Sequence, residues 1–457
     1  MRQRRSSQGQ WSSRFAFVLA AAGSAIGLGS IWRFPFVVGE NGGGTFVAAY
    51  VAAVLMVGLP LLIAEVMLGR RGRRNPISSM ALLSEEEAGH TGWRFSGMLG
   101  VGTGLLILSY YAVIAGWTLA YALRVVGGAG IGIGVDAASA SAAFDAMRGD
   151  LLEVALCHTI ILGAAAWIVG RGVEDGLERA VTFTMPLLVV LLLILVGWAL
   201  THGDAARAFD YLFHGESAQL DAGLMLAALG QVFFTLSIGM GALMAYGAYL
   251  PGNIKLVGAA LTVVCANGVV SLLAGLVIFP LVFRHGIDPA AGAGLVFATL
   301  PLAFASMPGG QAFGALFFAL LVLAALGSAI ALLEPAVAWA VESRKLSRPR
   351  AAVAVAGAVW LLGIPAATSF NLLTDFELLG HSPFDLVERF TSQVLLPLSG
   401  LSLALFAGWV MCKSSSVEEL DVGVGSRYSA WRFAIRWLAP GLLVVVGGAA
   451  ILAWLQG

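Results

Sequence analysis

The feature that most constrains this chain is an apolar segment, residues 15–38, that is long enough to cross a bilayer and yet is interrupted in its middle. The interruption is the stretch Gly23-Ser-Ala-Ile-Gly-Leu-Gly-Ser-Ile-Trp-Arg-Phe-Pro35, which combines three glycines and a proline with polar side chains. Unpaired backbone groups are costly in hydrocarbon, so a helix breaks at membrane depth only where it lines a cavity. The stretch therefore predicts a helix broken halfway across a membrane, whose two ends face a polar ligand.

A second apolar segment, residues 224–250, repeats this pattern. Ile26-Gly-Leu-Gly29 recurs there as Ile238-Gly-Met-Gly241, again near the middle of the segment. Two glycine-interrupted segments at corresponding places in the two halves of a membrane protein indicate a transporter binding site. We therefore expect the two breaks to share one ligand.

The composition is that of an all-α polytopic membrane protein embedded in a lipid bilayer. Of the 457 residues, 59% are hydrophobic and 11% are charged, and the mean hydropathy is +0.89. A net charge of zero gives no reason to expect a nucleic-acid partner, and no His-Glu-x-x-His motif or other sign of an enzyme is present. At about 20 apolar residues per span, we predict eleven transmembrane helices: 15–38, 44–69, 97–124, 151–170, 180–201, 223–250, 254–283, 311–341, 351–370, 386–412 and 430–455.

The distribution of basic residues predicts the orientation. Arginines and lysines gather in the loops after the second, fourth, eighth and tenth spans. By the positive-inside rule, these loops and the tail 1–14 face the cytoplasm, and the C-terminus lies outside. Residues 15–201 and 223–412 then hold five spans each in opposite orientations, as an inverted repeat requires, and residues 430–455 form an extra helix.

Four pairs of residues within the spans, each with at least one polar side chain, lie one helical turn apart, so that each pair shares a face. The pairs are Gln231 and Thr235, Asn267 and Ser271, Ile107 and Tyr111, and Ala324 and Ser328. Small polar residues often only join helices in membranes. Their occurrence together with two broken helices favours a shared cavity, and oxygen ligands without sulfur or imidazole suit a hard monovalent cation.

Three charged residues at membrane depth are a further signal, because such groups are costly and usually functional or paired. Arg33 and Glu388 are expected at the same outer end of the bundle, where they would close the mouth over a ligand. Glu334 interrupts the eighth span just before Pro335 and has no partner that the sequence identifies. It is the candidate for proton coupling.

In these stretches the chain resembles the neurotransmitter:sodium symporter family, in its bacterial amino-acid transporter branch. The motifs that carry the resemblance are the stretch 23–35 with Glu40-Asn-Gly-Gly-Gly44, Tyr110-Tyr111, Gly230-Gln-Val-Phe-Phe-Thr-Leu-Ser237, Leu333-Glu-Pro335 and the spacing of Gly176 and Pro186. The resemblance runs from Trp11 to about Trp409. It implies a LeuT-like fold, a 5+5 inverted repeat with discontinuous helices 1 and 6.

The resemblance also implies a function: symport of an amino acid with sodium by alternating access. The family's substrate pocket falls on Ser24, Ala25, Leu28, Gly29, Ile107, Tyr111, Phe234, Thr235, Ser237, Met240, Ser328 and Leu332. Backbone N–H groups at the first break would receive the substrate carboxylate, which a helix N-terminus favours. Carbonyls of both breaks would receive the ammonium.

Gly27 indicates the substrate class. Monoamine-transporting relatives have an aspartate here, which replaces the carboxylate that their substrates lack. A glycine leaves the negative charge to the ligand. With apolar walls that include Met240, a flexible side chain, we expect a neutral, hydrophobic or aromatic amino acid.

The family's two sodium sites carry over with two departures. The first site comprises Ala25, Ser30, Thr235 and Asn267, with Ser30 where relatives usually have asparagine. The second comprises Gly23, Ile26, Ala324, Gly327 and Ser328. Relatives offer a side-chain oxygen at the position of Gly327, so this site is one ligand short, and the sodium stoichiometry stays open.

A chloride site is a further hypothesis. Chloride-independent bacterial relatives tend to have a carboxylate at the position of Ser271, and no acid occurs between Leu256 and Phe283. A cation beside Asn267 would then lack a compensating charge. Chloride would bind among Tyr50, Gln231, Thr235, Asn267 and Ser271.

The gates carry over from the family as well. The outer gate is Arg33 with Glu388, which replaces the usual aspartate. For the inner gate, Glu342 matches the family's acid, but Gln8 stands at the arginine position, and Arg5 is the candidate substitute. Gly176 and Pro186 would let the fifth helix unwind and admit water to the second ion site.

Two other interpretations remain open. One is a transporter of the same fold that is coupled to protons or uncoupled, and the other is a membrane sensor that does not transport. Sodium is the expected coupling ion and chloride a candidate second ion. A monomer or weak dimer is expected.

Overall fold

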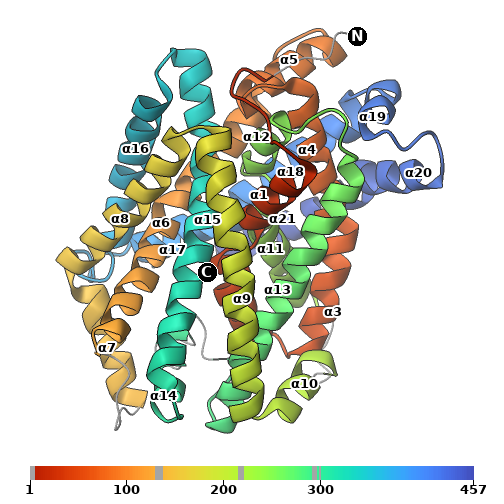
Figure 1. Ribbon diagram of the computed structural model, residues 1–457. Coiled ribbons are helices and arrows are strands. Elements are labelled where there is room, and N and C mark those ends of the chain that lie inside the picture. The colour runs from red at the N-terminus through yellow and green to blue at the C-terminus, as the bar shows by residue number, and fades with distance from the viewer. Residues whose placement is uncertain (1–5, 129–136, 215–220, 291–295, 298–299, 457) are drawn as a thin grey trace.

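The computed structural model describes residues 6–128, 137–214, 221–290, 296–297 and 300–456, with side chains to residue 448, and within these ranges it contains helices and no strands. The helices stand side by side as a bundle (Figure 1). In its first half they are α1 (Arg14–Ala25), α2 (Phe34–Glu40), α3 (Gly44–Ala53), α4 (Leu59–Gly72), α5 (Pro76–Ala88), α6 (Arg94–Val126), α7 (Ala137–Gly149), α8 (Leu151–Gly170), α9 (Arg179–His202) and α10 (Ala205–Phe213). In its second half they are α11 (Ala222–Leu236), α12 (Ala242–Ala248), α13 (Leu256–Arg284), α14 (Leu300–Ala305), α15 (Gly310–Arg344), α16 (Arg348–Thr368), α17 (Pro383–Arg389), α18 (Leu396–Leu405), α19 (Lys413–Leu420), α20 (Ser426–Phe433) and α21 (Ala439–Gln456).

Some of these helices are joined end to end by short π-helical turns, namely Val54–Gly58, Phe390–Leu395 and Ala434–Leu438. The π turn Val173–Glu178 extends the start of α9, and the π turn Phe406–Val410 extends the end of α18. Among the described residues, nine continuous helices are long and apolar enough to cross a membrane, or ten if α1 and the bent helix after it form one span. α11 and α12 together cover the predicted span 223–250, but neither is long enough to cross alone. The count of eleven spans therefore stays a prediction.

The first predicted break is present. α1 begins at the N-cap Ser13, whose side chain accepts from the Ala16 N–H, and it ends at Ala25. The chain resumes its helix with the π turn Gly29–Arg33, and the two parts are bent by 52°. Side chains around this break are buried, so its backbone groups face the interior of the protein, as the argument from hydrocarbon requires.

The second predicted break separates α11 from α12. Ser237, Gly239 and Gly241 all have positive φ, at 52°, 78° and 75°. Glycine adopts this region without a steric penalty, which explains its repetition here, whereas Ser237 is held there against the usual preference. The Ser237 hydroxyl donates to the Ser24 carbonyl at 2.9 Å, so the two breaks touch.

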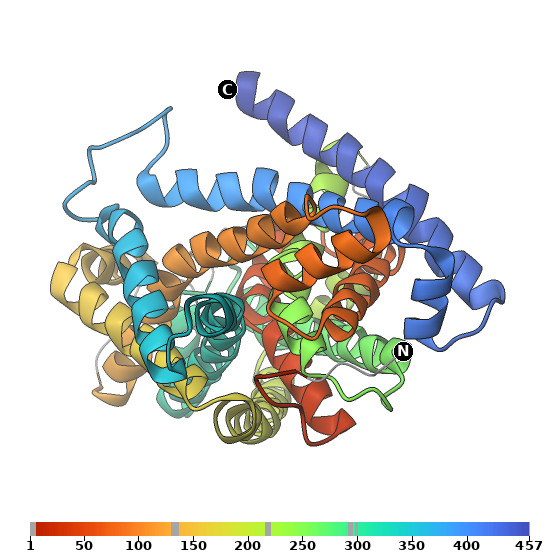
Figure 2. The same ribbon diagram turned by 90° about the horizontal axis from the view of Figure 1, so that it is seen from above.

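α12 lies against α4 at backbone distance. A Cβ at Gly69 of α4 would lie 1.9 Å from the Met244 carbonyl oxygen, and a Cβ at Gly247 of α12 would lie 2.4 Å from the Val66 carbonyl oxygen. Only glycine fits at either position. α16 and α21, by contrast, lie at the periphery of the bundle (Figure 2).

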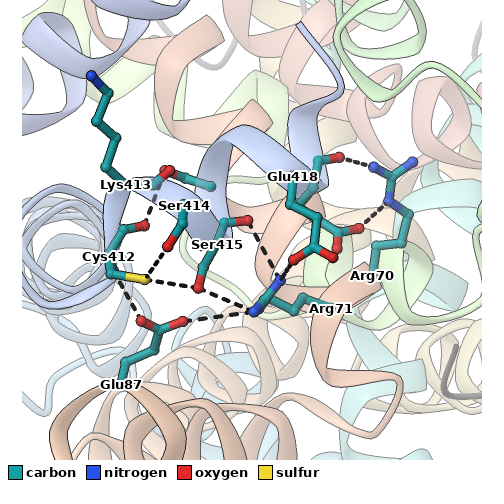
Figure 3. Close-up of polar contacts among 10 residues, drawn as sticks. Arg70, Arg71, Glu87, Cys412, Lys413, Ser414, Ser415 and Glu418 are labelled. Carbon is teal, nitrogen blue, oxygen red and sulfur yellow. Dashed lines mark hydrogen bonds and ion pairs between the residues drawn. The ribbon is translucent and has the colours of Figure 1, made fainter. Parts of the chain in front are cut away.

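The bundle has two ends that we name by their elements. The N-terminal face carries α5 and α19, and the far face carries α7, α10 and α14 (Figure 1). At the N-terminal face, α19 is held against α4 and α5 (Figure 3). Arg70 pairs with Glu419 at 2.5 Å, Arg71 donates to the Ser415 hydroxyl at 3.1 Å, and Glu87 accepts from the Cys412 N–H at 3.0 Å.

Candidate functional site

A small cavity lies where the two breaks meet. Its walls come from the first break, α6, the second break and α15, and they are formed by Ala25, Gly27, Gly29, Ile107, Tyr111, Phe234, Ser237, Met240, Ser328 and Leu332. Nine of these ten are residues of the predicted substrate pocket. The other three predicted residues lie directly behind the wall: Ser24 accepts from Ser328 at 3.1 Å, Leu28 donates to Tyr111 at 3.3 Å, and Thr235 points toward α3.

One end of the cavity is polar and carries no acid. The Leu28 N–H and the Tyr111 hydroxyl lie together there at 3.3 Å. A Cβ at Gly27 would lie 2.1 Å from the Ser328 Oγ and 3.0 Å from the Tyr111 hydroxyl oxygen. No side chain therefore fits at position 27 unless Ser328 moves, and this end of the cavity offers donors to a ligand rather than a negative charge.

The other end of the cavity is apolar. Ile107, Met240 and Leu332 are almost completely buried, and the ring of Phe234 covers the cavity from the side of Arg33. The Arg33 guanidinium lies over that ring at 4.6 Å from its centroid. The arrangement suits a ligand with one zwitterionic end and one apolar end.

The residues of the first predicted sodium site converge beside the polar end. The Ser30 hydroxyl lies 2.7 Å from the Asn267 Oδ1 and 3.1 Å from the Ala25 carbonyl oxygen. Thr235 is joined to this group through Tyr50, which bonds Thr235 at 2.9 Å and Asn267 at 3.1 Å. Hard oxygen atoms in this number and proximity fit a sodium ion.

The residues of the predicted chloride site are also brought together. Besides the Tyr50 contacts, the Gln231 Nε2 donates to the Gly29 carbonyl at 2.8 Å, and the Thr235 hydroxyl donates to the Gln231 carbonyl at 2.8 Å. The Ser271 hydroxyl is buried and makes no hydrogen bond within the described part of the chain. All five residues are uncharged and buried.

The residues of the second predicted sodium site are adjacent, but they fit an ion poorly. Gly23 on α1 lies against Gly327 on α15, whose Cβ, if present, would be 2.9 Å from the Gly23 carbonyl oxygen. The Ser328 hydroxyl is directed at Ser24. A thioether, that of Met185 on α9, packs at the same place.

Of the predicted gate pairs, the outer one is formed and the inner one is not seen among the described residues. Arg33 and Glu388 form an ion pair at 3.4 Å toward the far face. Glu342 at the N-terminal face accepts from the Asn75 backbone N–H at 3.0 Å and from its Nδ2 at 2.6 Å, and Gln8 accepts from Arg348 at 2.9 Å. Arg5 lies outside the described residues, so its predicted pairing has no structural counterpart here.

Of the two residues predicted to unwind the fifth helix, one lies in the π turn before α9 and the other lies within α9. Gly176 is in the π turn Val173–Glu178, where a Cβ would lie 2.1 Å from the Ile168 carbonyl oxygen. Pro186 is inside α9. Proline removes one backbone hydrogen bond, so α9 is weakest around its first two turns.

Three features of the site were missed by the sequence reasoning. Glu334 is completely buried and binds Arg348 at 2.5 Å and the Tyr249 hydroxyl at 2.6 Å. Glu65, within α4, accepts from the Gly239 N–H at 2.9 Å, inside the second break. The sequence feature that could have drawn attention to Glu334 and Glu65 is an acidic side chain within a membrane-spanning segment. Met185 gave no signal at all.

Comparison with known proteins gives consistent similarities. The model of the sodium:neurotransmitter symporter family matches residues 8–128 and 141–455. An uncharacterized sodium-dependent transporter of Bacillus subtilis, YhdH, is 34% identical over 440 residues, which cover 96% of each chain. A second, from Haemophilus influenzae, is 31% identical and covers 95% of this chain and 96% of its own. The crystal structure of MhsT in complex with L-phenylalanine matches with a TM-score of 0.90 and 39% identity, over 97% of this chain and all of that one.

Proposed function

Because the chain belongs to the sodium:neurotransmitter symporter family, it is a multi-pass membrane transporter of LeuT-like fold and not an enzyme, and we propose that its cargo is a neutral amino acid with an apolar or aromatic side chain. Sodium-coupled transport is the common property of its relatives. The identity of the substrate must be inferred from the residues that line this chain's own pocket.

The observation that carries the proposal is the tight packing around Gly27. Ser328 and Tyr111 occupy the space that a side chain at position 27 would need. The pocket wall contains no aspartate or glutamate. A cationic amine would therefore find no counter-charge, whereas an amino acid brings its own carboxylate to the Leu28 N–H and the Tyr111 hydroxyl.

The apolar end of the pocket supports the choice of side chain. Ile107, Met240 and Leu332 offer no hydrogen bond, so a polar side chain would lose its water without compensation. The bound ligand in the MhsT structure is L-phenylalanine. Phe234, lying under Arg33, would close over such a ligand.

The same proposal includes the sites of the bound ions and the orientation of the protein in the membrane. Sodium binds to Ala25, Ser30, Thr235 and Asn267, next to the substrate carboxylate. Chloride binds near Ser271, whose buried hydroxyl makes no hydrogen bond within the described residues and is free to donate. The N-terminal face lies in the cytoplasm, residues 15–201 and 223–412 are the two inverted repeats, and Arg33 with Glu388 closes the outer mouth.

Proton coupling through Glu334 has less support. Its carboxylate is already bound by Arg348 and Tyr249. We assign it instead to the closure of the N-terminal face.

Uptake by the purified protein in proteoliposomes tests the proposal. With an inward sodium gradient, we expect accumulation of one or more of phenylalanine, leucine, isoleucine, valine and methionine, and none with choline in place of sodium. Removal of chloride should slow uptake. Gly27→Asp should abolish amino-acid uptake, because the new carboxylate repels that of the substrate and displaces Ser328. Uptake of a decarboxylated analogue such as phenethylamine by the unaltered protein would contradict the proposal.

A further inference from the structure

We infer that this transporter carries its substrate with a single sodium ion, because Met185 fills the place of the second ion. The inference rests on the proposed sodium-coupled uptake and goes beyond it by fixing the ion stoichiometry. It concerns three segments that meet on the N-terminal side of the substrate cavity: α1, α9 and α15.

The geometry at this meeting point is close packing. A Cβ at Gly23 would lie 3.2 Å from the Met185 Sδ and 3.3 Å from its Cε, and a Cβ at Gly327 would lie 3.5 Å from the same Cε. The Met185 side chain is 3% exposed. It therefore packs against both glycines, in the space that a side chain at position 23 or 327 would enter.

The remaining ligands lack the side-chain oxygen that relatives supply at position 327. Gly23, Ile26 and Ala324 offer backbone carbonyls, and Ser328 offers a hydroxyl that is turned toward Ser24 at 3.1 Å. Hard cations are held by several oxygens, whereas a thioether is a soft ligand that suits metals such as Cu(I). A sodium ion here would have the Met185 thioether and its methyl group beside it in place of that oxygen.

The first site shows the contrast. There, the Ser30 hydroxyl lies 2.7 Å from the Asn267 Oδ1 and 3.1 Å from the Ala25 carbonyl oxygen, so three oxygens gather around one small side chain. The same chain thus has one site that its residues fit to sodium and one that they fit to an apolar contact. In the second, the packing of Met185 replaces the ion as the link between α1 and α15.

The test is the ion-to-substrate ratio of the full-length protein in proteoliposomes. We expect a hyperbolic dependence of the initial uptake rate on sodium concentration, and a ratio of one sodium ion per substrate from paired sodium-22 and amino-acid fluxes. A sigmoidal dependence with two sodium ions per substrate would overturn the inference while leaving the proposed function intact. Absence of sodium-dependent uptake would instead overturn the proposed function.

Thermal stability in detergent gives an independent test. Sodium stabilises a protein only through the sites that bind it. If there is one site, Ser30→Ala combined with Asn267→Ala should remove the whole increase in Tm that sodium produces, measured against potassium at equal ionic strength. A remaining increase would reveal a second site and contradict the inference.

A gain-of-function pair tests the role of Met185 directly. Met185→Ala with Gly327→Ser removes the thioether and supplies the missing hydroxyl, although the new Cβ requires the Gly23 carbonyl to shift by a few tenths of an ångström. We expect this pair to make the sodium dependence sigmoidal. Met185→Leu is the matched control, because it keeps an apolar side chain of similar volume, and it should keep the hyperbolic dependence. A hyperbolic dependence in both, with folded protein, would count against Met185 as the determinant.

Discussion

The contacts that close the substrate pocket toward the far face differ from those that close it toward the N-terminal face. Toward the far face, Arg33 and Glu388 lie 3.4 Å apart with side chains 19% and 28% exposed. Toward the N-terminal face, Glu334 is completely buried and binds both Arg348 and Tyr249. Exposed ion pairs contribute about 0–1 kcal/mol, whereas breaking a buried pair by removing one partner costs about 3–5 kcal/mol.

The difference extends to the surface of the N-terminal face. Arg348 also donates to Gln8 and to the Val169 carbonyl, both at 2.9 Å, which ties the segment before α1 to α16 and α8. Outside that network, α19 is bound to α4 and α5 (Figure 3). The structure is therefore a conformation that opens more easily at the far face than at the N-terminal face. The following predictions test that difference, from the largest expected effect to the smallest.

Replacing Glu334 should have the largest effect. In Glu334→Ala, the mostly buried Arg348 keeps its charge and loses its partner, so we expect a loss of about 3–5 kcal/mol from the closed N-terminal face. The measurement is the reaction rate of a single cysteine placed at Ser24 with a membrane-impermeant maleimide added from the N-terminal face. That rate should rise strongly. No increase would show that the buried pair does not hold this face closed.

Tyr249→Phe should have an intermediate effect on the same face. It removes one hydrogen bond to a carboxylate, which contributes about 1.5–3 kcal/mol, but leaves Arg348 paired. The same cysteine assay should give a rate between that of the parent and that of Glu334→Ala. Tyr246→Phe is the matched control, since Tyr246 lies three residues before Tyr249 and makes no hydrogen bond to Glu334 within the described residues.

Glu388→Gln should have a small effect on stability and a clearer one on ligand escape. The lost ion pair contributes about 0–1 kcal/mol, so Tm should change little. Dissociation of a radiolabelled amino acid toward the far face should become several-fold faster. If instead Glu388→Gln lowered Tm as much as Glu334→Ala, the proposed asymmetry between the two faces would be wrong.

The smallest predicted effect is on the reactivity of one cysteine thiol. Cys412 lies at the N-terminal face outside the membrane-spanning helices, and hydrogen bonds from the Ser414 and Ser415 hydroxyls lower the pKa of its thiol. A lower pKa gives more thiolate at neutral pH, so iodoacetamide should alkylate Cys412 at a lower pH than an ordinary thiol. Ser414→Ala with Ser415→Ala should move that pH profile upward. An impermeant reagent that labels Cys412 from outside intact cells would contradict the proposed cytoplasmic location of this face.

Much of the fold and of the pocket could be predicted from the sequence, because the breaks are encoded locally. The glycines around residues 27 and 239 determine where helices can end, and their apolar surroundings determine that the ends lie in a membrane. The pairing of Arg33 with Glu388 was predictable as well, since both charges were expected at one end of the bundle and had no nearer partner.

Other features depend on contacts between distant segments, which no local pattern encodes. Met185 reads as one more apolar residue of its helix, and only the packing of three helices places its sulfur beside Gly23. Glu65 binds the backbone of Gly239, 174 positions away, a contact that its own helix does not indicate. The sequence identified Glu334 as a costly charge within the membrane, but it did not identify its partner, because Arg348 lies after a turn at the start of the next helix.

The close approach of α4 and α12 has a mechanical consequence. With the Gly69 backbone pressed on Met244, the Gly247 backbone pressed on Val66, and Glu65 bound to Gly239, neither helix can slide or rotate past the other. The half-helix beyond the second break must therefore swing together with α4 as a single lever. Arg70 and Arg71 at the tip of α4 would pass that swing on to α19, more than 300 residues further along the chain.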